Sequence, residues 1–185
     1  RFGRDLVVPG SVRFPLDAAV GAELLARLRA GRVDVTTAIE LLWATPSVVA
    51  RFESTGTVDL ATAVRIGLVG PAARASGREL DVRRDHPLGA YCFAQLPIAV
   101  MTDGDVHARA FVRWLEIQRS LKLIEELVTA LPAPVAAPAA APALPADHLA
   151  VALVEGWRGE IVHVASTGGD GRFARDKVVA PSVHN

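Results

Sequence analysis

Cysteine is almost absent from this chain of 185 residues, and its scarcity excludes two kinds of site. Cys92 is the single cysteine, so the chain's own residues can form neither an internal disulfide nor a multi-cysteine metal site. The five histidines are scattered, and no pair has the spacing that places two metal ligands on one face of a helix. We therefore expect no metal site within these residues.

Charge of one sign is not in excess either. The 20 basic and 20 acidic residues give a formal net charge of zero, which argues against a protein that binds nucleic acid through its charge. No apolar run is long enough to cross a bilayer, and the first ten residues do not form a signal peptide. Together with the scarcity of cysteine, these features indicate a protein of a reducing compartment without a membrane span of its own.

Aromatic residues make up only 5% of the chain, although apolar residues make up 51%. A core of alanine, valine and leucine favours helices. Apolar side chains at i, i+4 spacing predict a helix over residues 15–30, which Gly31 ends. A second helix is predicted over residues 34–54, with a kink at Pro46. We expect the two helices to be antiparallel and joined by residues 31–33.

Residues 103–131 have the strongest helical pattern. Asp103 or Asp105 can cap the first turn, and Pro132 follows the last one. Apolar residues recur at intervals of three and four, which predicts a stripe that packs against other helices. The stripe consists of Phe111, Trp114, Ile117, Leu121, Ile124, Val128 and Leu131. We expect this helix to lie at the centre of a helical bundle.

The C-terminal part of the chain predicts a small sheet. Proline and alanine dominate residues 132–147, which is typical of an extended linker. Residues 148–166 predict a hairpin, and residues 173–179 a third strand. The expected fold is α+β and mainly α. It comprises an N-terminal turn with a helical bundle over residues 1–131, the linker, and a three-stranded antiparallel sheet within residues 148–185.

The stretch between residues 54 and 91 combines glycine, proline and charge. A short helical pattern leads into a turn at residues 67–71 that no regular helix can follow. The segment after this turn holds Arg74, Arg78, Arg83 and Arg84 together with Glu79, Asp81 and Asp85. Such a segment is either a solvated loop or a buried arginine-carboxylate cluster under a protein interface. We predict that Arg74 or Arg83 is buried and paired with a carboxylate from a distant segment.

The order and spacing of residues in this stretch and beyond it resemble a known family. Within the stretch the matching positions are Thr55, Gly56, Thr57, Val58, Ala61, Gly67, Gly70, Pro71, Arg74, Ser76, Gly77, Asp81, Arg83, Pro87 and Tyr91. Later matches are Gly104, Asp105, Arg109, Arg113, Glu116, Ser120, Glu155, Arg158, Gly159, Glu160, Arg175, Lys177, Pro181 and Ser182. The pattern is similar to the large-subunit family shared by membrane-bound nickel-iron hydrogenases of the formate hydrogenlyase type and the 49 kDa subunit of respiratory complex I. Trp157, where complex I usually carries proline, resembles the hydrogenase branch.

The resemblance implies the central scaffold of the large subunit of a multisubunit redox complex, most like a formate hydrogenlyase-type hydrogenase. In such hydrogenases, nickel and iron are held by two Cys-x-x-Cys pairs near the ends of the subunit, whereas this chain has one cysteine. Because it also begins at Arg1 rather than methionine, we expect a fragment that holds no metal and is inactive alone. The full complex would carry a nickel-iron site and a neighbouring iron-sulfur cluster.

Two alternatives stay open: a complex I 49 kDa-type subunit that reduces quinone, and a docking subunit that keeps the fold without the metal site. The implied partners are an iron-sulfur small subunit and membrane-arm subunits, on the cytoplasmic side of the membrane. No catalytic residue is identified. Arg109, Arg113 and Glu116 are expected to share a helix face that meets the arginine cluster or a partner. The structural or interface candidates are Arg74, Ser76, Asp81, Arg83, Asp105, Arg109, Arg113, Glu116, Glu155, Arg158, Arg175 and Lys177.

Overall fold

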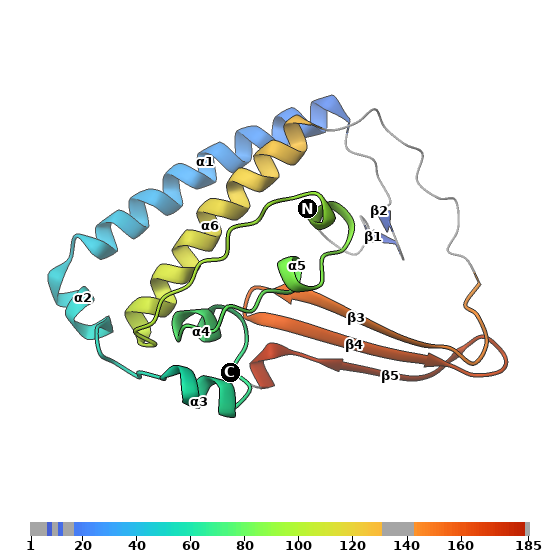
Figure 1. Ribbon diagram of the computed structural model, residues 1–185. Helices are drawn as coiled ribbons and strands as arrows, with labels where there is room; N and C mark the ends of the chain where they lie inside the picture. The colour runs from blue at the N-terminus through green and yellow to red at the C-terminus, as the bar shows by residue number, and fades with distance from the viewer. Residues whose placement is uncertain (1–6, 9–10, 13–16, 131–142, 184–185) are drawn as a thin grey trace.

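Two long helices and a projecting sheet dominate the molecule (Figure 1). The computed structural model describes residues 7–8, 11–12, 17–130 and 143–183. Helix α1 (Ala18–Trp43) and helix α6 (Val106–Thr129) lie side by side and run antiparallel. The short helices α4 (Gly70–Ala75) and α5 (Val82–Asp85) lie between α6 and the sheet. The expected class, α+β and mainly α, is confirmed.

Helix α1 corrects one expectation from the sequence. Residues 31–33 do not join two antiparallel helices but lie inside one continuous helix of 26 residues. Glycine in a helix interior costs only about 1 kcal/mol relative to alanine. That cost is outweighed here because Leu28 and Arg32, on either side of Gly31, line the contact with α6. Asp17 caps the helix by accepting a hydrogen bond from the Val20 amide at 2.8 Å.

Pro46 interrupts the helix as predicted. Helix α1 ends at Trp43, and α2 (Pro46–Phe52) starts at the proline, at 83° to α1. Proline suits a first helical turn because the amide hydrogen that it lacks would have no partner there. Within the described ranges, no single helix has the length and hydropathy of a membrane span, although α1 and α2 meet both criteria when counted as one bent pair.

Helix α6 lies close to its expected bounds. Asp105 rather than Asp103 caps it, accepting a hydrogen bond from the Ala108 amide at 2.8 Å. The deepest burial on the helix falls on Ala108 and Val112, which pack in a core cluster with Ala75 of α4. These small residues, rather than the large side chains of the expected stripe, let α4 approach closely.

The expected stripe of α6 packs beside this line. Its first member, Phe111, lies 6.2 Å from the Trp43 ring between centroids, and His107 lies 5.0 Å from the same tryptophan. This end of the stripe therefore packs on α1. Towards the other end, Ile124 is exposed, so the stripe is not buried along its whole length.

The predicted sheet is confirmed, with antiparallel strand order β3-β4-β5. Strands β3 (Leu149–Gly156) and β4 (Gly159–Thr167) form a hairpin in which Glu155 lies opposite Glu160. Strand β5 (Phe173–Val179) follows, and Pro181 opens the 3-10 helix η2 (Pro181–Val183). The hairpin tip lies against α4, while the other end of the sheet projects away from the helices (Figure 1).

The glycine-rich stretch is more helical than expected. Helix α3 (Leu60–Arg65) leads into the predicted turn, after which the charged segment forms α4 and α5. The 3-10 helix η1 (Gly89–Cys92) closes the stretch. Short helices escape sequence patterns because they are too brief to show a period.

Short strands near the N-terminus form a second sheet. Strands β1 (Val7–Val8) and β2 (Ser11–Val12) pair antiparallel, in the part of the chain where the sequence predicted an N-terminal turn. Residues 131–142, most of the expected linker, lie outside the described residues. The division of the chain into three parts stays a prediction.

Candidate functional site

Helix α4 carries an arginine into the interior. Gly70 has a φ of 65° and Pro71 occupies the first turn, so the chain bends sharply into a helix of six residues. Ala73 and Ala75 are fully buried on either side of Arg74, which is 0% exposed. A buried guanidinium needs partners, because an unpaired buried charge is strongly destabilising.

Carboxylates from three segments surround Arg74. Its Nε donates to Glu116 Oε1 of α6 at 2.7 Å, and its Nη2 lies 2.7 Å from the same oxygen as an ion contact without hydrogen-bond geometry. Its Nη1 donates to Glu155 Oε1 of β3 at 3.0 Å and to the Leu80 carbonyl at 2.7 Å. Nη1 also lies 3.5 Å from Asp81 Oδ2. The prediction that Arg74 or Arg83 is buried and paired with a carboxylate from a distant segment is confirmed for Arg74.

Arg83 completes this group, which we call the Arg74 cluster: Arg74, Asp81, Arg83, Glu116 and Glu155. Arg83 holds Asp81 through two side-chain hydrogen bonds, from Nε to Oδ1 at 2.9 Å and from Nη2 to Oδ2 at 2.6 Å. Asp81 also accepts the Arg83 amide at 3.0 Å and thereby caps α5. The partner of Arg83 is thus only two residues away, so distant pairing is a property of Arg74 and not of Arg83.

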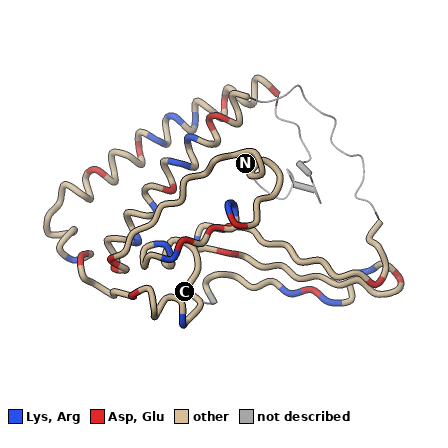
Figure 2. Tube along the Cα trace, viewed as in Figure 1, with Lys and Arg blue, Asp and Glu red and all other residues tan. Residues whose placement is uncertain are grey.

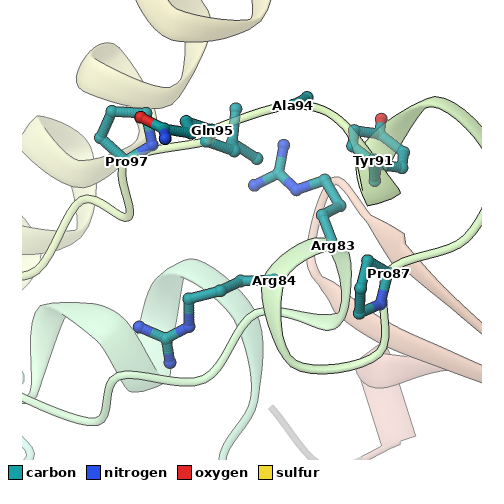
Figure 3. A pocket seen from close by; sticks show the side chains of 8 residues that line it. Arg83, Arg84, Pro87, Tyr91, Ala94, Gln95 and Pro97 are labelled. Atoms are coloured by element: carbon teal, nitrogen blue, oxygen red, sulfur yellow. The ribbon is translucent and has the colours of Figure 1, made fainter.

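Charged residues gather around α4 and α5 (Figure 2). At the outer edge of the cluster, Arg83 borders a surface pocket of about 350 Å³. Figure 3 shows its guanidinium directed beneath the loop that carries Tyr91, Ala94 and Gln95, whereas Arg84, which also lines the pocket, extends farther from that loop. The two neighbouring arginines therefore have different surroundings, and Arg83 alone of the two belongs to the cluster.

Two glycines let the sheet reach the cluster. A Cβ at Gly70 would lie 2.3 Å from Gly159 Cα and 2.4 Å from the Arg158 carbonyl oxygen. Gly159 has a φ of 130°, and only glycine adopts such a conformation at so close an approach. The hairpin tip therefore packs backbone to backbone on α4, which places Glu155 beside Arg74. Both glycines belong to the sequence pattern, but nothing in the pattern shows that they touch.

The arginines of α6 bond backbone rather than carboxylates. Arg109 Nη1 donates to the carbonyls of Gly56 at 3.1 Å and Gly104 at 2.7 Å. Arg113 Nη1 donates to the Arg109 carbonyl at 3.2 Å, and burial, together with the Arg109 charge, lowers the pKa of Arg113. Of the three α6 residues expected to share one face, Glu116 bonds Arg74, Arg109 bonds the loop carbonyls of Gly56 and Gly104, and Arg113 bonds a carbonyl of its own helix.

The remaining candidates lie outside the Arg74 cluster. Ser76 and Asp105 are buried and bond nearby backbone groups. Arg158 is exposed at the hairpin tip, and Arg175 and Lys177 are exposed on β5. An interface role for these residues stays a prediction.

The carboxylates of the cluster differ in proton affinity. Burial acts to raise the pKa of Asp81, but the hydrogen bonds and charge of Arg83 outweigh it and hold that pKa below its ordinary value. Burial also raises the pKa of Glu155, and there the charge of Arg74 and the Val82 amide offset it only in part. The cluster thus joins a firmly ionised aspartate to a glutamate that binds a proton more readily.

Comparison with known proteins identifies the family of this chain. The family model described as "Respiratory-chain NADH dehydrogenase, 49 Kd subunit" matches residues 1–151. The chain belongs to this family. The carbon monoxide-induced hydrogenase of Rhodospirillum rubrum is 36% identical over 147 residues, which cover 80% of this chain and 40% of that protein. An NADH-quinone oxidoreductase subunit of Chloroherpeton thalassium is 42% identical over 82 residues, which cover 44% of this chain and 19% of that protein.

A solved structure shares the fold of this member of the 49 kDa-subunit family. It belongs to the membrane-bound sulfane sulfur reductase, an archaeal respiratory membrane complex, with a TM-score of 0.85 and 24% sequence identity. The match covers 96% of this chain and 50% of that chain. The chain thus spans half the length of this structural relative and 40% of the Rhodospirillum one. The family resemblance seen in the sequence is confirmed.

The 49 kDa-subunit family is part of hydrogenase and complex I assemblies that carry metal cofactors. A nickel-iron site needs a set of thiolate ligands, and this chain has one cysteine, Cys92, which is exposed. Among the residues that the structure describes, no group of three or more histidine, cysteine, aspartate or glutamate side chains could hold a metal ion. The residues of this chain therefore do not fit a nickel-iron centre by themselves.

Proposed function

We propose that this chain is the central scaffold of the large subunit of a multisubunit redox complex, most like a hydrogenase of the formate hydrogenlyase type. The observation that carries the proposal is the Arg74 cluster, which ties α4, α6 and β3 together through one buried guanidinium. A subunit that holds a redox centre at a set distance from its partner needs such a rigid frame. The 36% identity to a hydrogenase over 80% of the chain supports the choice of branch.

Exposed apolar side chains support a place inside a larger assembly. Phe93 is 93% exposed, and Leu88 and Leu149 are also largely exposed. Exposed aromatic and large aliphatic side chains of this kind become buried where a partner subunit covers them. Our proposed partners at these surfaces are an iron-sulfur small subunit and membrane-arm subunits, which would place the chain at the cytoplasmic side of a membrane without spanning it.

In the complete complex, a nickel-iron site and a neighbouring iron-sulfur cluster would be held by cysteines that this chain does not contain. Their chemistry would be electron transfer coupled to the formation or use of hydrogen. The contribution of this chain would be mechanical: the Arg74 cluster and the contact of Gly70 with Gly159 hold the hairpin tip in place. We expect the chain alone to be inactive.

Two other functions fit the same family. The match to a subunit of an NADH-quinone oxidoreductase, 42% identical over 82 residues, favours a quinone-reducing complex. The single cysteine also fits a docking subunit that keeps the fold without a metal site. Both alternatives use the scaffold described above and differ in what the assembled complex does.

The test is to isolate the protein with an affinity tag from the cells that make it, under mild detergent, and to identify what is isolated with it. We expect an iron-sulfur protein and integral membrane proteins in stoichiometric amounts, and hydrogen evolution from reduced methyl viologen. NADH-dependent quinone reduction without hydrogen evolution would favour the complex I alternative. An assembled complex with neither activity would favour the docking subunit, and isolation of the protein alone would overturn all three.

A further inference from the structure

The Arg74 cluster contains more acidic than basic groups. Its hydrogen-bonded members are three carboxylates and two guanidiniums. Arg83 bonds Asp81 through both Nε and Nη2. Of the Arg74 nitrogens, Nε and Nη2 both contact Glu116 Oε1. Of the two guanidiniums, only Arg74 bonds Glu155, and it does so through Nη1 alone. The same nitrogen also donates to the Leu80 carbonyl. Glu155 is therefore the least compensated carboxylate of the cluster, although its side chain is only 4% exposed.

A second carboxylate lies opposite Glu155. In the β3–β4 register Glu155 pairs directly with Glu160, so the two side chains lie on the same face of the sheet. Residues in direct cross-strand register have Cβ atoms about 4.5–5.5 Å apart, and like charges there repel each other. One bound proton removes this repulsion.

A cavity connects this pair to the surface. It measures about 120 Å³, and its wall includes Glu155, Glu160, Asp85 and His86. Asp85 and His86 are exposed, so water reaches the cavity from their side. On the protein side, Glu155 Oε2 accepts the Val82 amide at 3.1 Å and keeps further lone-pair capacity.

We propose that Glu155 is a proton-binding site that exchanges protons with solvent through this cavity. In the step, a hydronium ion gives its proton to the Glu155 carboxylate, one O–H bond forms, and water is released, so the charge of the side chain changes from −1 to zero. The site goes beyond the scaffold role, because it supplies a buried, reversible proton acceptor whatever reaction the complex performs. The charged and titratable groups that face Glu155 are Arg74, Asp81, Arg83, Asp85, His86, Glu116 and Glu160.

Burial raises the pKa of Glu155, which agrees with this assignment. The two oxygen contacts of the side chain explain why the proton is compatible with the fold. A neutral carboxyl group still accepts from Arg74 Nη1 and from the Val82 amide, and Arg74 keeps Glu116 and Asp81 as charged partners. Protonation therefore changes the charge of the cluster without breaking it.

The test is an NMR titration of the chain with carbon-13 in the glutamate carboxyl groups. The Glu155 signal is assigned through the backbone of the unmodified chain, and exposed Glu79 serves as the internal control. We expect Glu155 to titrate above the ordinary glutamate pKa of about 4.3 and at a higher pH than the Glu79 control, while circular dichroism shows that the fold is intact. A Glu155 midpoint at or below that of Glu79, or a titration seen only as the chain unfolds, would overturn the proposal.

A second variant separates proton binding from a purely structural role. Glu160→Gln removes the opposing charge but keeps the shape of the cavity wall, so the Glu155 midpoint should fall. Glu79→Gln, which removes an exposed charge, should leave it in place. An unchanged Glu155 titration midpoint in Glu160→Gln would show that the two carboxylates are not coupled through the cavity. That result would contradict the proposal. These measurements use the isolated chain, so their failure would leave the proposed scaffold function standing.

Discussion

Arg74 is the residue whose loss should cost the fold most. Replacing it with alanine leaves Glu116, Glu155 and Asp81 without their shared guanidinium, and breaking a buried ion pair typically costs about 3–5 kcal/mol. We expect Arg74→Ala to lower the free energy of unfolding by an amount in that range, measured by urea titration. Arg83→Ala should also destabilise clearly, because the Asp81 side chain is buried.

Arg29→Ala is the matched control for this measurement. Arg29 pairs with Glu125 between α1 and α6, but its side chain is largely exposed. An exposed pair contributes roughly 0–1 kcal/mol. If all three arginine variants shift the unfolding midpoint by the same small amount, the Arg74 cluster does not stabilise the fold as its burial indicates.

Asp81 should make the stability depend on pH at the acid end. Its folded-state pKa is lowered by Arg83, so its contribution is fully present above the unfolded value of about 3.9 and is lost as pH falls through the lower folded value. We expect Asp81→Asn to be less stable than the wild type at pH 6. The difference between their free energies of unfolding should become smaller below pH 3.9. A gap that stays constant from pH 6 to pH 2.5 would contradict the assigned direction.

At the level of helices and turns, replacing glycine with alanine should have opposite effects on stability at two positions. Gly31 lies inside α1, and a Cβ there would meet no atom within 4 Å. Gly31→Ala should therefore stabilise the protein by roughly 0.5–1 kcal/mol, through higher helix propensity. A loss of stability in thermal unfolding would mean that α1 needs the flexibility of glycine at this position.

Gly70→Ala should destabilise strongly, because its Cβ would lie 2.3 Å from Gly159 Cα. Gly67 offers the control: it has a similar φ of 71°, but a Cβ there would meet nothing within 4 Å. Gly67→Ala thus reports the backbone strain alone, about 1–2 kcal/mol. The excess loss in Gly70→Ala measures the contact between α4 and the hairpin. Equal losses in the two variants would show that this contact is not tight in solution.

These elements also show how far local patterns reach. The bounds of α6 and of the sheet were predictable, because their periods extend over many residues. The continuity of α1 past Gly31 was not, since it depends on packing against α6 rather than on the local signal for a helix end. Within the cluster, the density of charge indicated a buried arginine. That Glu155 reaches it depends on the contact between Gly70 and Gly159, which has no local pattern.

For the molecule as a whole, burial is concentrated where α4 meets α6, and the sheet becomes more exposed away from its hairpin tip. Fully buried Ala75, Ala108 and Val112 lie in the first region, whereas β5 is exposed along almost its whole length. Local opening is easiest where few apolar contacts resist it. In hydrogen exchange we expect the amides of α4 and the first half of α6 to exchange slowest, and those of β5 fastest within the sheet. Strongest protection in β5 would contradict this gradient.

The span of the Arg74 cluster along the chain also determines when it can be completed during synthesis. Arg74 precedes Glu116 by 42 residues and Glu155 by 81 residues. At about 5–20 residues per second, the ribosome needs on the order of 4–16 s to make the longer of these intervals. Throughout that time the guanidinium on α4 lacks the partner that β3 supplies. The nascent protein therefore keeps this charge accessible to water until the hairpin of β3 and β4 has left the exit tunnel.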